Sequence, residues 1–199
     1  ESREMYEREL KPGLERQHAC VYPESCEALR ANIGLLESQM ASVDTSGVNA
    51  SGRKRGWLYN DFNAGNVLVG ADGKTTAILD IDQSGVGPFV WDLGNTLASF
   101  ATQLKKQKRE VEIEPMTRAL LRAYHAEFPL PLEEYALCLA ATQRWDLMRI
   151  LRGLRRHLYE NDRLGELFKK VPDRLLPRLQ WAPEQFAFLT ESWIRNTLV

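Results

Sequence analysis

The chain has 199 residues, of which 44% are hydrophobic and 27% charged, so it can form the core of one good-sized domain or two small ones. Its 26 Lys and Arg residues nearly balance 27 Asp and Glu, and the net charge of −1 excludes the basic composition of a dedicated nucleic-acid-binding protein. No apolar run approaches the roughly 18–20 residues of a membrane-spanning helix. Three cysteines favour no disulfide framework. We therefore expect a cytoplasmic protein with neither nucleic-acid nor membrane partners.

The first 56 residues predict helices followed by a loop. Residues 5–10 have short helical character that should end near Pro12, because proline lacks the amide donor of a helix interior. A longer helix is expected over residues 25–40, where apolar residues at spacings of three and four share one face. Residues 45–56 are rich in Ser, Gly and Asn and then in Arg, which indicates a loop.

Three short apolar runs follow, at residues 57–59, 66–69 and 75–79. Their β-branched residues favour strands, and the turn residues Asp72 and Gly73 separate the last two runs. The sequence therefore predicts a β-hairpin with a tight connection.

From Asp92 onward the pattern is helical. We expect helices that start near Asp92, at Pro115, over residues 132–158 and near Pro183. The predicted fold class is mainly α with a small β-hairpin region, an α+β arrangement in a single domain of residues 1–199.

Three polar residues surround the predicted hairpin. Asp61 precedes it, Asn66 begins its first strand and Asp80 ends its second strand. Because antiparallel strands bring Asn66 and Asp80 to the same end, the three side chains should lie close together. Oxygen ligands suit Mg²⁺, so Asn66 and Asp80 are candidate metal ligands, and Asp61 could orient an alcohol or accept its proton. The alternative is that these residues only form turns, as Asp and Asn commonly do.

This segment resembles the C-terminal lobe of the aminoglycoside phosphotransferase and choline kinase family, which has a protein-kinase-like fold. The family's catalytic loop reads roughly His-Gly-Asp-x-x-x-x-Asn, and Ile-Asp-(Phe/Trp)-(Glu/Asp) follows the hairpin. The resemblance is strong over residues 57–100. It implies that Asp61 is catalytic, that Asn66 and Asp80 bind the nucleotide through Mg²⁺, and that Asp82 is a further metal-binding position.

Other family positions are matched or replaced. Gly87-Pro88 and Trp91-Asp92-Leu93 match family runs, and the resemblance implies that Asp92 is a structural brace for the catalytic loop. Where the family has His-Gly, this chain has Tyr59-Asn60. Tyr59 can take the bracing role of the His, and Asn60 would strain the loop if a positive φ is needed there, although Asn tolerates such angles better than most residues.

The resemblance also implies an organisation of the chain. Residues 57–95 would form the catalytic and metal-binding segment, and residues 96–199 a helical acceptor-binding subdomain. The family's nucleotide lobe is absent before residue 1, so we expect it to be a partner, supplied by the same parent chain or by a separate polypeptide.

Two functions remain open. The first is an ATP- and Mg²⁺-dependent phosphotransferase that acts on a hydroxyl of a small molecule such as an aminoglycoside, a sugar or an amino alcohol. The second is a non-catalytic kinase-like lobe with a structural or protein-interaction role. Candidate acceptor-pocket residues are Asp146, Glu160 and Asp162. Arginines between Arg144 and Arg156 form either an anion-binding face or a solvated helix surface. The sequence identifies neither the acceptor nor the oligomeric state.

Overall fold

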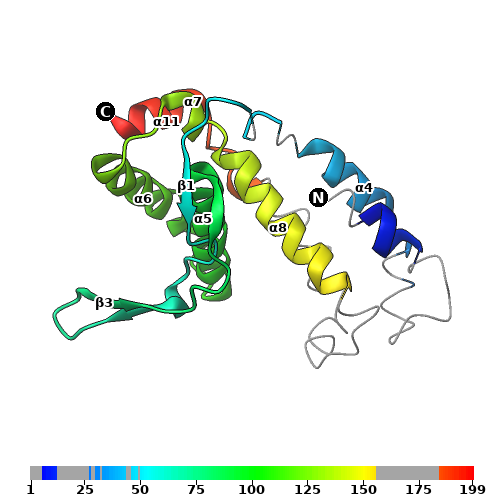
Figure 1. Cartoon of the computed structure of the whole chain (residues 1–199), viewed down its shortest axis with the longest axis horizontal. Coiled ribbons are helices and arrows are strands. Elements are labelled where there is room, and N and C mark those ends of the chain that lie inside the picture. The colour runs from blue at the N-terminus through cyan, green and yellow to red at the C-terminus, as the bar shows by residue number, and fades with distance from the viewer. Residues whose placement is uncertain are drawn as a thin grey trace. The chain divides into compact units, whose positions relative to one another are not determined.

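A computed structural model describes residues 6–12, 27, 30–31, 33–43, 46–48, 50–155 and 184–199 (Figure 1). The chain divides into two compact units. The first comprises Glu1–Asp44 and Arg144–Glu184, and the second comprises Thr45–Gln143 and Gln185–Val199. The mainly helical α+β class is confirmed, while the separate roles expected for residues 57–95 and 96–199 stay a prediction.

The described part of the first unit is helical. It contains η1 (Tyr6–Leu10), a π-helix that continues as helix through Pro12, then α4 (Ile33–Ser42) and the later turns of α8 (Cys138–Arg155). The Tyr6 hydroxyl donates to Oε1 of Glu37 over 3.0 Å, which ties η1 to α4. The expected helix over residues 25–40 is present where it is described, but its predicted start at Ser25 lies outside the described residues.

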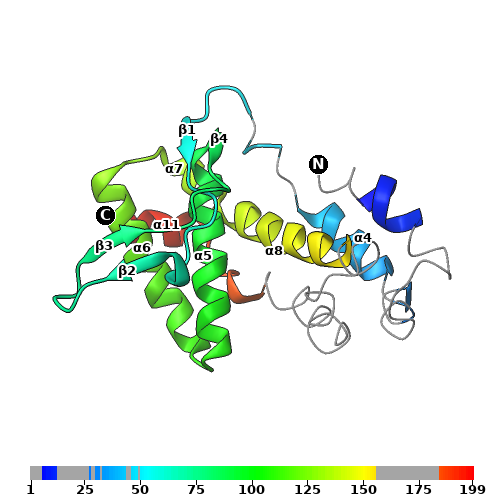
Figure 2. The same cartoon turned by 60° about the horizontal axis from the view of Figure 1, so that its bottom comes forward.

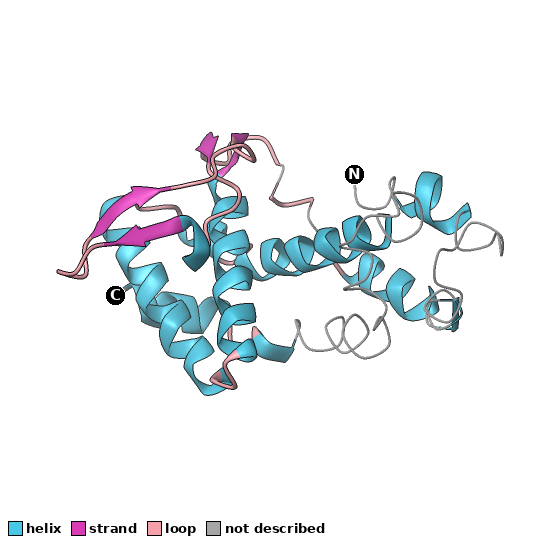
Figure 3. Ribbon diagram, turned by 90° about the horizontal axis from the view of Figure 1, so that it is seen from below, coloured by secondary structure: helices cyan, strands magenta, loops and turns pink. Residues whose placement is uncertain are grey.

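Two separate antiparallel strand pairs lie in the second unit (Figure 3). The expected hairpin is confirmed as β2 (Val67–Val69) and β3 (Thr75–Ile78). The other pair joins β1 (Arg55–Leu58) to β4 (Gly85–Pro88), a strand that the sequence did not predict. A Cβ atom at Gly56 would stand 2.4 Å from the Phe89 ring, so glycine permits this close approach.

The helices of the second unit form its core. They are α5 (Phe89–Lys106), α6 (Ile113–Glu127), α7 (Leu132–Tyr135), the start of α8 and α11 (Glu191–Leu198), with 3-10 turns η3 (Ala64–Asn66) and η4 (Glu110–Glu112). Helices α5 and α6 lie side by side (Figures 1 and 2). Their buried apolar residues include Val90, Leu93, Leu97, Ala98, Ile113 and Leu121. None of the helices in the described ranges is long and apolar enough to cross a bilayer.

Three helix predictions need correction. The single helix expected over residues 132–158 is interrupted, because α7 ends at Tyr135 and α8 begins at Cys138. Tyr135 is fully buried, and its hydroxyl accepts a hydrogen bond from the amide of Leu130, so tertiary packing sets this break. Helix α6 begins two residues before Pro115 rather than at it. Residues 184–185 are helical, as expected near Pro183, but a turn over residues 186–188 interrupts the expected helix, and α11 begins at Glu191, capped by the Thr190 side chain.

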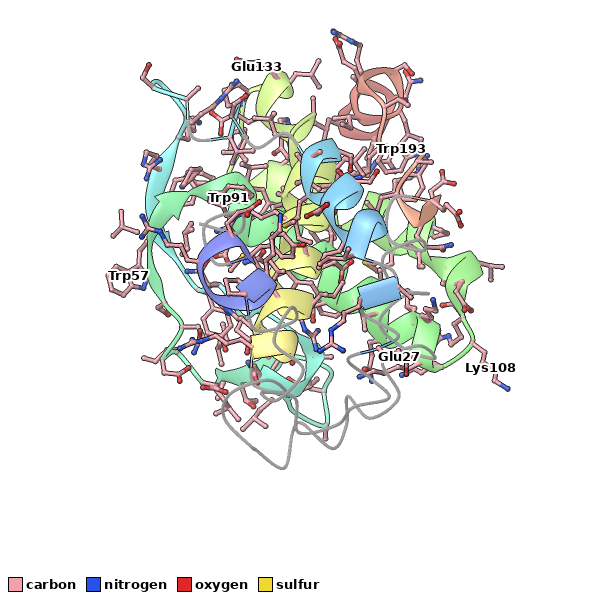
Figure 4. The ribbon with its side chains drawn as sticks, turned by 90° about the vertical axis from the view of Figure 1, so that its right-hand side faces the viewer. Glu27, Trp57, Trp91, Lys108, Glu133 and Trp193 are labelled. Carbon is pink, nitrogen blue, oxygen red and sulfur yellow. The ribbon has the colours of Figure 1, made fainter. Side chains whose placement is uncertain are left out.

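The surface of the β1–β4 pair carries apolar side chains. Trp57 is 71% exposed and points outward from β1, whereas Trp91 lies buried among other side chains at the start of α5 (Figure 4). Val86 is paired with Trp57 across the two strands and is also exposed.

Candidate active site

The loop between β1 and β2 is held together by its own amide side chains. Nδ2 of Asn66 donates to Oδ2 of Asp61 and to the Asp61 carbonyl, each over 3.0 Å. Nδ2 of Asn63 donates to the same carbonyl over 2.9 Å, while its Oδ1 caps η3 by accepting from Gly65 N. Asp61 and Asn66 are therefore in direct contact, as the spacing of the loop predicts.

The start of this loop is attached to α5 through Asp92. Its two carboxylate oxygens accept hydrogen bonds from the amides of Tyr59 and Asn60, over 2.8 and 2.6 Å. Burial raises the pKa of the Asp92 carboxyl, and the two amide hydrogen bonds lower it. One turn further along α5, Nδ2 of Asn95 donates to the Asn60 carbonyl over 3.4 Å. These contacts fix the backbone immediately before Asp61.

Two non-glycine residues of the site have a left-handed backbone. Asn60 has a φ of 66°, and Asp80, after the end of β3, has a φ of 59°. The condition under which Asn60 strains the loop is thus met, but Asn and Asp are the non-glycine residues that adopt this region most readily.

Asp80 and Asp82 form a carboxyl pair beside Asn66. The amide of Leu79 donates to the Asn66 carbonyl over 2.8 Å, which places the end of β3 against the start of β2. A hydrogen bond with Asp82 and the negative charge of Asp82 raise the pKa of Asp80, with smaller contributions from burial and from the charge of Asp61. The carboxyl groups of Asp80 and Asp82 are therefore close to each other, and Asp61 is near enough for its charge to act on Asp80.

The candidate ligands carry oxygen donors, the kind of atom that a hard divalent cation prefers. In the described part of the chain, no group of three or more His, Cys, Asp and Glu side chains is arranged for a metal ion. A metal held here would consequently use the amide oxygen of Asn66 together with carboxylates of Asp80 and Asp82. Because Nδ2 of Asn66 is already bonded to Asp61, its Oδ1 remains as the ligand atom, and oxygen donors are those that Mg²⁺ prefers.

Tyr59 connects the loop to the carboxyl pair. Its hydroxyl donates to the Leu79 carbonyl, and its ring packs edge-on against Phe62 at 5.9 Å. Desolvation raises the pKa of the phenol, a hydrogen bond with Asn66 lowers it, and the charges of Asp61, Asp80 and Asp82 raise it further. The phenol thus lies close to all of the predicted site residues around the hairpin.

Asp146, a suggested acceptor-pocket residue, is buried in the part of α8 that belongs to the first unit, and its role stays a prediction. Glu160, Asp162 and Arg156 lie outside the described residues, so their suggested roles stay predictions.

Two site residues were missed by sequence reasoning, Asn63 and Asn95. Asn63 carried a usable signal, because Asn favours the position before a helical turn.

The comparisons with known proteins concern this same region. A family model described as the phosphotransferase enzyme family matches residues 1–110, which include the loop, the hairpin and α5. No curated protein and no solved structure matches the chain significantly.

Proposed function

Because this chain belongs to the phosphotransferase enzyme family, we propose that it carries the catalytic loop and metal site of an ATP- and Mg²⁺-dependent kinase that acts on a hydroxyl group of a small molecule. The observation that supports this proposal is the contact of Asp61 with Asn66 beside the Asp80–Asp82 pair. A turn-forming role alone would not require the Asn66 side chain to bond to the Asp61 carboxylate.

Each residue has a role in this proposal. Asp61 orients the acceptor hydroxyl and accepts its proton, while Asn66, Asp80 and Asp82 hold Mg²⁺. The metal, when bound, neutralises charge on the nucleotide phosphates. Asp92 and Tyr59 act indirectly, since they fix the backbone on either side of the reacting groups. Catalysis then consists of positioning the acceptor hydroxyl and neutralising the charge on the nucleotide phosphates.

The proposal includes the partners of the site. The acceptor is a small hydroxyl compound such as an aminoglycoside, a sugar or an amino alcohol, in a cytoplasmic setting. A nucleotide lobe, from the same parent chain or from another polypeptide, completes the ATP site.

One observation favours a second candidate, a non-catalytic lobe with an interaction role. The Tyr59-Asn60 pair replaces the His-Gly that precedes the family's catalytic Asp. The two candidates differ in whether Asp61 is required for turnover.

We would measure ADP release from Mg-ATP with a panel of hydroxyl acceptors, with and without the nucleotide lobe. Asp61→Asn should lower turnover by about 10²- to 10⁴-fold, the usual contribution of a positioned general base. Asp72→Asn is the matched control, because this exposed carboxylate lies in the hairpin turn. Full turnover in Asp61→Asn would contradict the catalytic role. Absence of any turnover in the unmodified protein with its nucleotide lobe would favour the interaction role.

A further inference from the structure

The two residues that depart from the family pattern both bond to the segment that carries the carboxyl pair. The Tyr59 hydroxyl donates to the carbonyl of Leu79. Nδ2 of Asn60 donates to the carbonyl of Gln83 over 3.1 Å. One acceptor immediately precedes Asp80 and the other immediately follows Asp82, so the two bonds enclose the carboxyl pair. The glycine of the family pattern has no side chain with which to make the second bond.

We propose that Tyr59 and Asn60 are positioning residues that hold the Asp80–Asp82 segment at both ends, and we call this pair of bonds the two-point clamp. The effect of the clamp on catalysis rests on the proposed function. The restraint of residues 80–83 by the clamp is independent of that function.

The restrained segment needs external support. The side chains of residues 80–83 are all exposed, and Asp80 has the left-handed φ of 59°. The only backbone hydrogen bond between residues 80 and 84 described here is from Ser84 N to the Ile81 carbonyl. The bonds to the Leu79 and Gln83 carbonyls supply anchors at both ends of this exposed segment.

The other side of the clamp is rigid. The amides of Tyr59 and Asn60 both bond to Asp92, and the Asn60 carbonyl accepts from Asn95, so helix α5 holds both residues. Asp61 follows directly in the chain. The same short stretch therefore positions the catalytic carboxylate and, through the clamp, the two candidate metal ligands.

The test measures amide hydrogen exchange of a peptide covering residues 79–84. We would compare Tyr59→Phe, Asn60→Gly, Asn60→Asp and the double variant Tyr59→Phe/Asn60→Gly with the unmodified chain. Loss of one hydrogen bond should speed exchange in this peptide about three- to tenfold, and the double variant should exceed either single change. Asn60→Gly and Asn60→Asp both tolerate the left-handed backbone, so they remove the donor without adding strain.

Asp72→Asn is the matched control. This exposed carboxylate lies in the hairpin turn, outside the measured peptide, so the control should exchange like the unmodified protein. Peptides from α6 report the general stability of the unit and should be unchanged in every variant.

A second readout separates positioning from folding. The Mg²⁺ concentration that gives half-maximal protection of residues 79–84 should rise severalfold in the clamp variants. The half-saturating Mg²⁺ concentration for turnover should rise in parallel, while turnover at saturating Mg²⁺ changes much less. A purely structural defect would lower the active fraction and leave both Mg²⁺ dependences unchanged.

Three results would each overturn the clamp. In the first, residues 79–84 of the double variant exchange at the rate of the unmodified protein. In the second, exchange in α6 increases as much as in residues 79–84, and in the third, Asn60→Asp exchanges like the original protein. If the unmodified chain shows no phosphoryl transfer, the proposed kinase function fails, but the metal-free exchange experiment still decides the clamp. If Asp61→Asn abolishes turnover and the double variant changes nothing, the kinase function stands and the clamp falls.

Discussion

Removal of the Asp92 carboxylate is the sharpest test of how the site is held. In Asp92→Ala the amides of Tyr59 and Asn60 lose their acceptors. An unsatisfied, partly buried amide costs about 1–3 kcal/mol. Removing the carboxylate also removes the free-energy cost of burying its charge, the cost that raises its pKa, and this offsets part of the lost stability. We expect a loss of about 3 kcal/mol for Asp92→Ala. Asp92→Asn keeps one acceptor oxygen and should lose about half as much.

The measurement is equilibrium urea unfolding followed by far-ultraviolet circular dichroism, with the slope of free energy against urea checked for constancy. Glu133→Ala is the control, since this exposed carboxylate on α7 should change the free energy of unfolding by less than about 0.5 kcal/mol. A loss below that limit in Asp92→Ala, or equal losses in the Ala and Asn variants, would refute the assignment of two separate hydrogen bonds to this carboxylate.

Three other changes test the packing of the chain. Gly94→Ala should destabilise the protein by about 2 kcal/mol, because the added Cβ would stand 2.3 Å from a side chain of α8. Gly34→Ala is the control, because it has open space around it and should be neutral or stabilising. Thermal unfolding compares the two variants. Arg118→Lys should cost about 1 kcal/mol in urea unfolding, because the guanidinium stacks at 4.5 Å over Trp193, and an unchanged midpoint would contradict that contribution. Burial raises the pKa of the Cys138 thiol well above its ordinary value, which lowers the fraction of reactive thiolate. Peptide mapping after iodoacetamide treatment at pH 8 should therefore find Cys138 alkylated only after unfolding. Rapid alkylation in the folded chain would contradict its burial.

Local signals explain what the sequence could predict. The hairpin was recognisable because two β-branched runs flank a turn at Asp72 and Gly73. Its geometry then brings Asn66 next to the segment that carries Asp80. The strand β4 was not recognisable, because Gly-Val-Gly-Pro has weak strand propensity and its pairing partner β1 lies far away in the sequence.

The contacts that tie the site together depend on long-range packing. The resemblance suggested that Asp92 holds the loop, but no local pattern indicated that its two oxygens would serve Tyr59 and Asn60 separately. The bond from Asn60 to the Gln83 carbonyl joins residues 23 positions apart, and only the folded chain shows it. A side chain at the end of a strand has no periodicity from which its partner could be inferred.

The exposed Trp57 on β1 gives this surface an intrinsic optical reporter. Its indole is solvated while that of Trp91 is buried, so the two should emit at longer and shorter wavelengths, respectively. Any molecule that covers the β1–β4 strands would move the Trp57 emission toward the blue. Subtraction of a Trp57→Phe spectrum isolates that contribution, which makes association at these strands measurable by titration without a label.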